Sequence, residues 1–366
     1  MATIAILGLS ITSSWGNGHA TTYRGLVKAL ARRGHDVVFL ERDVPWYASH
    51  RDLADPPYCR THLYADREEL DRRFSAIVRE ADAVIVGSYV PEGVEVGKWA
   101  LARASGPVAF YDIDTPVTLA KLARGDEEYL TAELIGAYHH YLSFTGGPTL
   151  DRLRQLGSPD PVPFYCAVDP DVHHPLDVAR DWRLGYLGTY SPDRQPTLER
   201  LLLAPARDLS DARFVVAGPQ YPEDTAWPEN VSYIWHLPPS EHGAFYCGQD
   251  FTLNITRADM RAAGWSPSVR LFEAAACGVP VISDTWDGLA DFFEPGREIL
   301  LAESTAEVVE FLNDIDEAGR QAIGAAARAA VLRSHTADHR AEQLEQLFSL
   351  RPAARSENTR HPEPVS

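Results

Sequence analysis

The sequence predicts an α/β protein with two doubly wound domains, each a parallel sheet covered by helices. Two observations carry this prediction. Short apolar strands alternate with helical segments, and this alternation stops near residues 164–177 and then restarts. The length of 366 residues agrees, because at about 150 residues per domain the chain holds roughly two to two and a half domains.

The first half opens with a βαβ unit. A β-rich run at 4–9 leads through a Gly/Ser/Asn loop into a helix at 21–33, and a second strand follows at 37–40. Continuous apolar runs of this kind are typical of buried parallel strands. The pattern then continues with helices near 67–80 and 93–104 and strands at 83–86 and 108–111.

The second half begins after a stretch rich in proline and acidic residues. Its expected strands lie at 184–188, 213–218, 251–254 and 279–283, with helices near 195–204 and 268–277. We therefore assign residues 1–170 to an N-terminal domain and 178–350 to a C-terminal domain. Residues 351–366 are proline-rich and polar, which predicts a disordered tail.

Composition excludes several classes of function. The formal charge of −18 argues against a large basic groove, so no nucleic-acid partner is expected. No apolar run approaches the roughly 20 residues of a membrane span, and the N-terminus lacks the marks of a signal peptide. The four cysteines lie far apart without metal-ligand spacing, so we expect a cytoplasmic protein with reduced thiols and no metal or cofactor. The sequence does not determine the oligomeric state.

The loop and helix at 259–280 hold the most chemistry. Ser266 is a suitable N-cap and Pro267 suits the first helical position, which would leave the amides of Ser268 and Val269 free. Free amides and the helix dipole together attract phosphate. An ordinary helix cap is the alternative interpretation.

Charged residues surround this predicted helix start. Arg257 and Arg270 could supply positive charge to a bound phosphate. Glu273 lies in a helix that is otherwise almost entirely apolar, where a lone buried carboxylate would be costly. A role in accepting hydrogen bonds from a ribose diol would explain it, whereas the alternative is a surface residue of an amphipathic helix.

The segments 270–284, 287–289, 294–300 and 253–257 resemble the nucleotide-sugar site of GT-B glycosyltransferases of the family 4 type, in particular the spore-maturation CgeB-like branch. The resemblance implies two facing Rossmann-like domains with a cleft between them, the acceptor on the N-terminal side and the donor on the C-terminal side. It also implies that Glu273 binds the ribose and that Ser268 and Val269 bind the diphosphate. Family members usually carry another Glu eight residues earlier, where this chain has Trp265.

A second loop, at 188–196, follows the first strand of the C-terminal half. A loop that closes over a diphosphate needs glycine for close approach and a cation for charge, and Gly188 and Arg194 meet these needs, with Thr189 between them. Related enzymes place an Arg and a Lys here. Because no Lys is near, Arg194 would act with another arginine such as Arg257; a plain surface loop is the alternative.

The loop at 13–22 of the N-terminal half lies between a strand and a helix. Its Gly-x-Gly lacks the full dinucleotide fingerprint, because the third glycine position holds Thr21. Together with the Gly-His at 34–35 it resembles the opening of the same family, where this loop faces the donor. Gly16 and Gly18 are therefore donor-binding candidates and His19 is a catalytic candidate, whereas we expect His35 to be structural.

Two carboxylates end the strand at 108–111. Asp114 is better placed beyond the strand end than Asp112, and it could orient the acceptor or a hydroxyl of the donor sugar. An Asp-x-Asp pair can bind metal, but the two-domain pattern favours the metal-independent GT-B class; a structural role is the alternative. The corner at 145–149 could contact an acceptor or be a plain turn.

The leading hypothesis is a glycosyltransferase, specifically a hexosyltransferase, that moves a sugar from a nucleoside diphosphate to an unidentified acceptor hydroxyl. UDP as the nucleotide, retention of configuration and metal independence are implied by the resemblance. Two alternatives stay open. A nucleotide-sugar epimerase could use Asp112 or Asp114 with Asp284, and the absence of the first Glu at Trp265 would suit a catalytically inactive nucleotide-binding partner.

Overall fold

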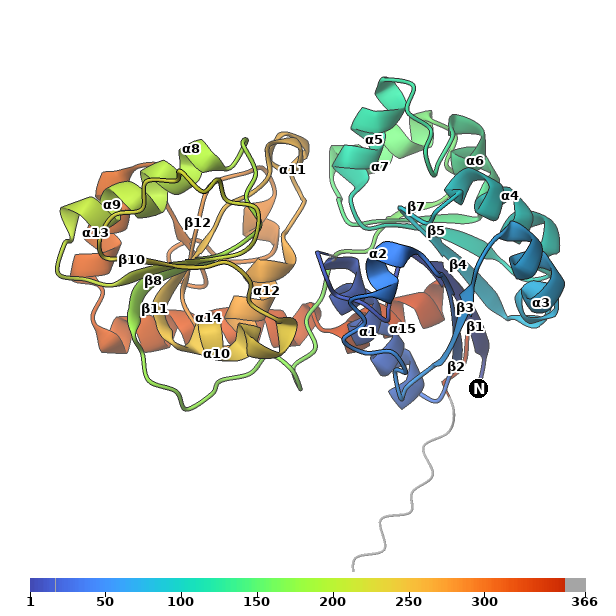
Figure 1. The fold of residues 1–366 in the computed structure, drawn as a ribbon, viewed down its shortest axis with the longest axis horizontal. Helices are drawn as coiled ribbons and strands as arrows, with labels where there is room; N and C mark the ends of the chain where they lie inside the picture. Colours follow the sequence, from blue (N-terminus) through green and yellow to red (C-terminus); the bar gives the residue numbers. More distant parts are fainter. Residues whose placement is uncertain (17, 353–366) are drawn as a thin grey trace, which may run out of the picture.

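The computed structural model describes residues 1–16 and 18–352 and contains two parallel sheets, one in each half of the chain (Figure 1). The first sheet has the strand order β3-β2-β1-β4-β5-β6-β7 and the second has the order β10-β9-β8-β11-β12-β13. The predicted pair of doubly wound α/β domains is therefore confirmed. Residues 353–366 of the predicted tail lie outside the described residues.

The N-terminal sheet confirms the strands that were expected and adds short ones. The sequence analysis did not assign β3 or β7, which lie at the two edges of the sheet. The strands are β1 Thr3–Gly8, β2 Asp36–Arg42, β3 Arg60–Tyr64, β4 Ala83–Gly87, β5 Val108–Asp112, β6 His140–Ser143 and β7 Pro161–Pro163. The helices are α1 Gly18–Arg32, α2 Pro45–Ala48, α3 Arg67–Glu80, α4 Gly93–Arg103, α5 Thr115–Ala123, α6 Ala132–Ala137 and α7 Pro148–Gln155.

The C-terminal sheet is built in the same way. Its strands are β8 Trp182–Leu187, β9 Phe214–Ala217, β10 Val231–Ile234, β11 Gln249–Asn254, β12 Val281–Ser283 and β13 Leu300–Leu301. The helices before β12 are α8 Gln195–Leu198, α9 Ala204–Asp208, α10 His242–Cys247, α11 Ala258–Ala263 and α12 Val269–Ala276, with a π-helical segment at Glu199–Leu203 between α8 and α9. The helices after it are α13 Thr305–Asp314, α14 Glu317–Ser334 and α15 Ala337–Leu347, and short 3-10 turns lie at Pro239–Glu241 and Leu289–Asp291.

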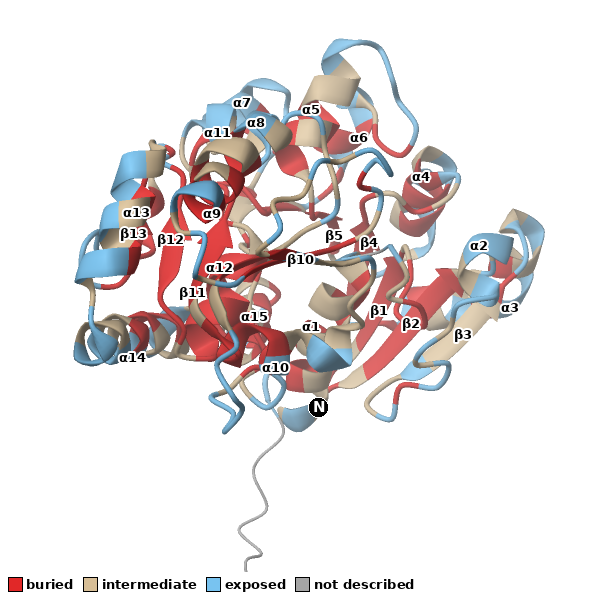
Figure 2. Ribbon diagram, turned by 60° about the vertical axis from the view of Figure 1, so that its left-hand side comes forward, coloured by how far each residue is buried: buried red, intermediate tan, exposed pale blue. Residues whose placement is uncertain are grey.

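The sheets form the centre of each half, and the helices cover them. Figure 2 shows the strands of both sheets as largely buried, whereas the outer helices expose one side. Every residue of β4, β5, β9 and β12 is buried. This burial on both faces explains why these strands appear in the sequence as continuous apolar runs rather than as an alternating pattern.

The chain crosses between the halves twice, at neighbouring points. Val168 forms a parallel bridge with Thr336, and the amides of Val168 and Ala337 bond to the carbonyls of His335 and Val168 at 3.0 and 2.8 Å. After the second crossing, α15 packs against α1 of the N-terminal half (Figure 1). The division into domains at 1–170 and 178–350 stays a prediction, to which the structure adds this return of the last helix.

Buried charge holds α15 in place. The carboxylate of Glu345 accepts hydrogen bonds from Arg33 at 2.8 and 2.5 Å, and its Oε1 lies 2.8 Å from His35 Nε2. The hydrogen bonds from Arg33 hold the pKa of Glu345 below its usual range, against the effect of burial. The structural role expected for His35 is thus a contact across 310 positions of sequence.

Candidate active site

Loops at the carboxyl ends of β8 and β11 hold the residues proposed to bind the donor. This end of a parallel sheet is where open α/β folds bind ligands. The loop after β8 contains Gly188 and Arg194, and the segment after β11 contains Arg257 and leads into α12. β8 and β11 pair directly, so the two loops are neighbours in space although about 60 residues separate them.

Gly188 is required by close packing. A Cβ atom built on it would lie 2.5 Å from Tyr186 Oη and 2.9 Å from Arg270 Nη2. Such contacts are far shorter than van der Waals separation, so a side chain at position 188 would force Tyr186 and Arg270 to shift. The predicted need for a glycine at this position therefore has a specific cause.

Arg270 is buried beneath this loop and is held by oxygen atoms. Its Nε donates to the carbonyl of Leu187 at 2.5 Å, and its Nη1 donates to Asn254 Oδ1 at 2.8 Å. The guanidinium also lies 4.8 Å from the centre of the Tyr186 ring, within the range of a cation–π interaction. These contacts fix a positive charge at the carboxyl ends of both strands.

Three arginines lie close together here. Burial is the largest influence on the pKa of Arg194 and lowers it, and the charges of Arg270 and Arg257 lower it further. Arg194 Nη2 donates to the carbonyl of Thr189 at 2.5 Å, whereas its buried Nε has no hydrogen-bond partner within residues 1–16 and 18–352. The structure thus brings together the three cations that the sequence analysis selected.

The two loops are also tied to each other by Asp193. Its Oδ2 accepts a hydrogen bond at 2.8 Å from the amide of Ala258, the first residue of α11. The carboxylate therefore satisfies a free amide at a helix start. This contact fixes the loop that carries Arg194 against the segment that carries Arg257.

The helix start differs from the prediction. α12 begins at Val269 with Ser268 as its N-cap, and the side chain of Ser268 donates to Asn254 Oδ1 at 2.7 Å instead of capping the helix. Ser266 was expected to be the cap, but its hydroxyl bonds to Thr145 Oγ1 of the N-terminal half at 2.9 Å. That expectation was wrong because a partner distant in sequence takes the hydroxyl.

Glu273 is buried, with only 4% of its surface exposed. Tyr246 Oη donates to its Oε2 at 2.9 Å, while His173 Nε2 lies 3.7 Å from Oε1 and His242 Nδ1 lies 3.9 Å from Oε2. Burial would raise the pKa of Glu273, but the neighbouring imidazoles and the Tyr246 hydroxyl outweigh it and hold the pKa below its usual range. The surface-residue interpretation is thereby excluded.

On the N-terminal side, Asp114 and His19 gather around Tyr89. Tyr89 Oη donates to Asp114 Oδ2 at 3.4 Å, and the Tyr89 ring meets the His19 ring edge-on at 5.3 Å. Burial lowers the pKa of His19 to about 4, so its imidazole is neutral at pH 7. Across the domain interface, Arg257 Nη1 lies 3.7 Å from Asp114 Oδ2. The proposed catalytic pair therefore lies beside the arginine cluster.

Asp112 and Asp284 are committed to internal hydrogen bonds. Asp112 is fully buried and accepts from Tyr141 Oη at 2.5 Å and from Thr118 Oγ1 at 2.8 Å, and burial raises its pKa to about 6. Asp284 accepts from the amide and the hydroxyl of Thr256. Of the three carboxylates considered for acid–base chemistry, Asp114 alone faces the opposite domain.

Trp265, which occupies the position of the missing Glu, connects the two halves. Its carbonyl accepts a hydrogen bond from Gly146 at 2.9 Å, and its Nε1 donates to Asp291 Oδ2 at 2.6 Å. A Cβ atom on Gly147 or Gly288 would lie within 2.5 Å of its ring, so glycines on both sides make room for it. The corner at 145–149 is thus a domain contact rather than a free turn.

The sequence analysis missed an aromatic group that spans both halves. Trp15 stacks on His50 with ring centres 4.6 Å apart, and it lies 4.8 Å from His236 and 6.1 Å from Trp235. Trp235 is 58% exposed. Tyr89 was missed too; its φ of 62° is unusual for a residue other than glycine. These aromatic residues lie in segments that follow strands, where ligand-binding loops are found, and this position was the available signal.

The remaining donor-binding candidates lie on the surface. Gly16, Gly18 and Thr189 are exposed, and Gly16 has a φ of 59°. Gly18 is the first residue of α1. The carbonyl of Thr189 holds Arg194, and the donor-binding roles of all three residues stay predictions.

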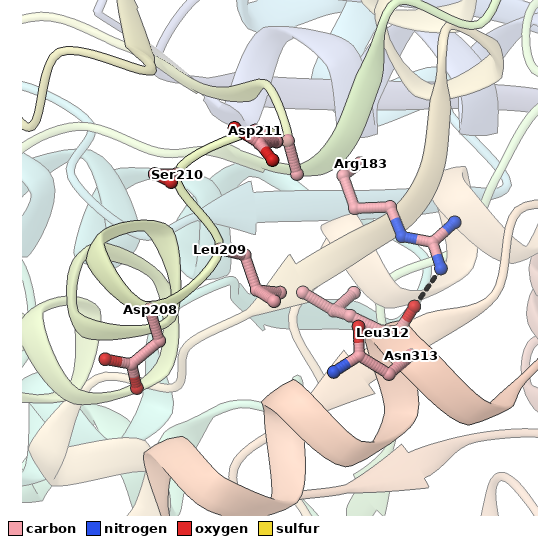
Figure 3. Close-up of a pocket in the computed structure, with 8 residues that line it drawn as sticks. Arg183, Asp208, Leu209, Ser210, Asp211, Leu312 and Asn313 are labelled. Carbon is pink, nitrogen blue, oxygen red and sulfur yellow. Dashed lines mark hydrogen bonds between the residues drawn. The ribbon is translucent and has the colours of Figure 1, made fainter.

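A hollow at the other end of the C-terminal sheet lies apart from this site. Figure 3 shows it between the turn after α9, the start of β8 and the end of α13. Arg183 lies in it and donates to the carbonyl of Leu312 and to Asp250 Oδ2. These residues are at the amino ends of strands, opposite the arginine cluster.

No helix within residues 1–16 and 18–352 is long and apolar enough to cross a membrane.

Comparison with known proteins gives matches of two kinds. Residues 194–346 match a family model described as glycosyl transferase-like. Among solved structures, the chain is similar to an alpha-glucosyltransferase in complex with UDP, with a TM-score of 0.71 and 12% identity over 95% of this chain and 100% of that one. No curated protein sequence matches the chain.

Two further structures have the same architecture. HepE of Anabaena in complex with UDP-glucose has a TM-score of 0.70 and 13% identity over 95% of this chain and 100% of that one. Sucrose-phosphate synthase from Thermosynechococcus elongatus has a TM-score of 0.69 and 16% identity, with 95% and 98% of the two chains covered. The chain therefore has the GT-B fold, as the sequence resemblance implied.

The close packing around Gly188 gives a stability test. We expect Gly188→Ala to lower the free energy of unfolding by about 1–3 kcal/mol, because the added methyl group overlaps Tyr186 and Arg270. Gly18→Ala is the matched control, since nothing lies within 4 Å of a Cβ atom there. Urea denaturation of both variants measures the difference, and equal stability would show that the loop relaxes freely.

Proposed function

We propose that this protein is a glycosyltransferase that moves a sugar from a UDP-sugar to an acceptor hydroxyl. The observation that carries the proposal is the cluster of Arg194, Arg257 and Arg270 at the carboxyl ends of β8 and β11. A chain with a net charge of −18 concentrates cations there, where a leaving diphosphate needs stabilisation. The glycosyl transferase-like model covers all three arginines, and two of the similar structures are described with UDP or UDP-glucose.

The donor would lie along the C-terminal side of the domain interface. Arg194 and Arg257 reach its diphosphate, and Arg270 fixes the positive end of the site from below, together with the amides at Ser268 and Val269. Gly188 and Thr189 form the adjoining loop. Glu273 accepts hydrogen bonds from the ribose, and Gly16 and Gly18 approach the donor from the opposite domain.

The chemistry would take place where Asp114 and His19 face these arginines. A neutral His19 and the carboxylate of Asp114 can each accept a hydrogen bond from a sugar hydroxyl or from the acceptor. We propose a hexosyl transfer with retention, in which the arginines alone balance the diphosphate charge without a metal. Membership of the CgeB-like branch is part of this proposal.

Of the alternatives, the epimerase receives the least support. An epimerase needs two carboxylates around one sugar. Here the carboxylate of Asp112 accepts hydrogen bonds from Tyr141 and Thr118, and that of Asp284 accepts them from Thr256. The second alternative, a catalytically inactive nucleotide-binding protein, agrees with the presence of Trp265 where related enzymes have Glu. Its side chain is packed between glycines of both domains and offers no carboxylate.

A panel of nucleotide sugars tests the function. We expect free UDP to form from a UDP-sugar only when a suitable acceptor is present, since transfer needs both substrates. An isomerised sugar without acceptor would establish epimerisation instead, and tight binding of UDP without any turnover across donors and acceptors would establish the inactive module. Thermal shift with each nucleotide identifies the donor to use.

The proposed ribose contact is tested by pairing a variant with a changed ligand. We expect the wild-type protein to bind UDP more tightly than 2′-deoxy-UDP by about 1–3 kcal/mol, because a charged acceptor loses its hydrogen bond. In Glu273→Gln this preference should largely disappear. Calorimetry measures both affinities, and an unchanged preference in the variant would refute the ribose assignment.

Asp114 should affect turnover rather than donor binding. We expect Asp114→Asn to lower kcat by roughly 10²-fold, as for the loss of a positioned acid–base group, while the Kd for UDP changes by less than about threefold. Asp126→Asn, in the exposed segment that follows α5, is the matched control. A variant of Asp114 with normal kcat would remove this residue from the mechanism.

A further inference from the structure

A cluster of two buried side chains and one partly exposed side chain adjoins the proposed donor site. It consists of His173 from the segment between the domains, His242 from α10 and Glu273 from α12. One ligand atom from each residue lies within 4.8 Å of the other two. His173 and Glu273 are 3% and 4% exposed, so the cluster is largely sealed from solvent.

Three of the four imidazole nitrogens of this cluster lack hydrogen bonds. Both ring nitrogens of His173 and Nδ1 of His242 are buried without a partner among the residues that the structure describes. Leaving such groups unsatisfied costs about 1–3 kcal/mol each, and buried polar atoms in proteins are nearly always paired. The distances of 3.7 and 3.9 Å to the two oxygens of Glu273 are too long for hydrogen bonds, so the carboxylate does not satisfy these nitrogens.

The surroundings of the cluster orient its ligand atoms. His242 Nε2 lies 3.3 Å from the carbonyl of Leu237, so a proton on Nε2 leaves the lone pair on Nδ1 directed at the cluster. Tyr246 Oη donates to Glu273 Oε2 at 2.9 Å and fixes the carboxylate. Hydrogen bonds of this kind to the far side of a ligand are the usual support of metal sites.

We propose that His173, His242 and Glu273 bind a divalent transition-metal ion, with Zn²⁺ as the best match. Two imidazoles and a carboxylate suit Zn²⁺, Co²⁺ or Ni²⁺, whereas Mg²⁺ and Ca²⁺ prefer oxygen ligands only. Ligand atoms around tetrahedral zinc are about 3.3 Å apart, because the bonds are about 2.0–2.1 Å long. The three atoms therefore need inward shifts of an ångström or less, and a water molecule supplies the fourth ligand.

The proposed metal ties the segment between the domains to the C-terminal half. His173 belongs to that segment, while the other two ligands belong to helices that flank the second sheet. The proposed ligands are not the arginines that would bind the diphosphate, and the proposed transfer does not use the metal. It shares Glu273 with the proposed ribose contact, so metal binding is measured without nucleotide.

Direct metal titration tests the proposal. Full-length protein without a histidine tag is stripped with a chelator and titrated with ZnCl₂ in a calorimeter, and Co²⁺ is titrated in parallel. We expect one Zn²⁺ per chain, a visible absorption spectrum typical of four-coordinate Co²⁺, and a rise in Tm on metal addition. Lack of stoichiometric binding would overturn the proposal, whatever the result for UDP.

Variants locate the bound ion. We expect His173→Phe and Glu273→Gln each to weaken Zn²⁺ binding by at least about tenfold, since each removes a ligand. His174→Ala is the control, because His174 is the partly exposed neighbour of His173 and its side chain bonds to the carbonyl of Pro175 rather than to the cluster. Circular dichroism confirms that both variants fold. Equal affinity in His173→Phe and wild type would assign the ion to surface histidines and refute the site.

Discussion

The site depends on holding three guanidinium groups close together at one end of a parallel sheet. Like charges repel, and burial makes the repulsion stronger because water screens it less. The structure offsets this cost by placing oxygen atoms around the cations: the carbonyls of Leu187 and Thr189 and the amide oxygen of Asn254. None of these three acceptors is charged, and Asp114 is the carboxylate that lies 3.7 Å from Arg257 Nη1. An anionic group with two phosphates is the natural complement of such an arrangement.

This constraint reaches into the backbone. A Cβ atom at position 188 would lie 2.9 Å from Arg270 Nη2, beneath the loop after β8. The next strand makes a stricter demand, since a Cβ atom on Gly218 would lie 2.2 Å from the backbone carbonyl of Gly188. Asp193 then fastens the same loop to the start of α11. The two glycines, Asp193 and Arg270 are therefore packed against one another at the ends of the strands. A substitution at one of these positions is expected to displace its neighbours.

Local patterns in the sequence were sufficient for the central strands of both sheets and for the residues that follow these strands. Gly188, Arg194, Arg270 and the buried Glu273 were all recognisable from their place after a strand or within an apolar helix. Strands as short as β7 and β13 carry too few residues for an apolar period and were not assigned.

Contacts between distant parts of the chain could not be predicted. Ser266 has the local pattern of a helix cap, yet Thr145, 121 positions away, binds its hydroxyl. The packing of α15 against α1 depends on the contacts of Glu345 with Arg33 and His35. The amphipathic pattern of α15 in the sequence does not indicate these contacts. In the same way, only the folded chain brings His173 and His242 to Glu273.

The carboxylate of Glu273 shows why burial is informative about function. An acidic side chain buried in an apolar helix lowers stability unless hydrogen bonds, opposite charges or a ligand offset the cost of burying its charge. Here one hydrogen bond from Tyr246 is the only one that the described residues give it, and two imidazoles stand near but out of hydrogen-bond reach. A carboxylate has room for about four hydrogen bonds. This geometry suits a carboxylate that binds a partner from outside the chain. In a purely structural role, we would expect Glu273 to lie within hydrogen-bond distance of the two imidazoles, or an apolar side chain to take its place.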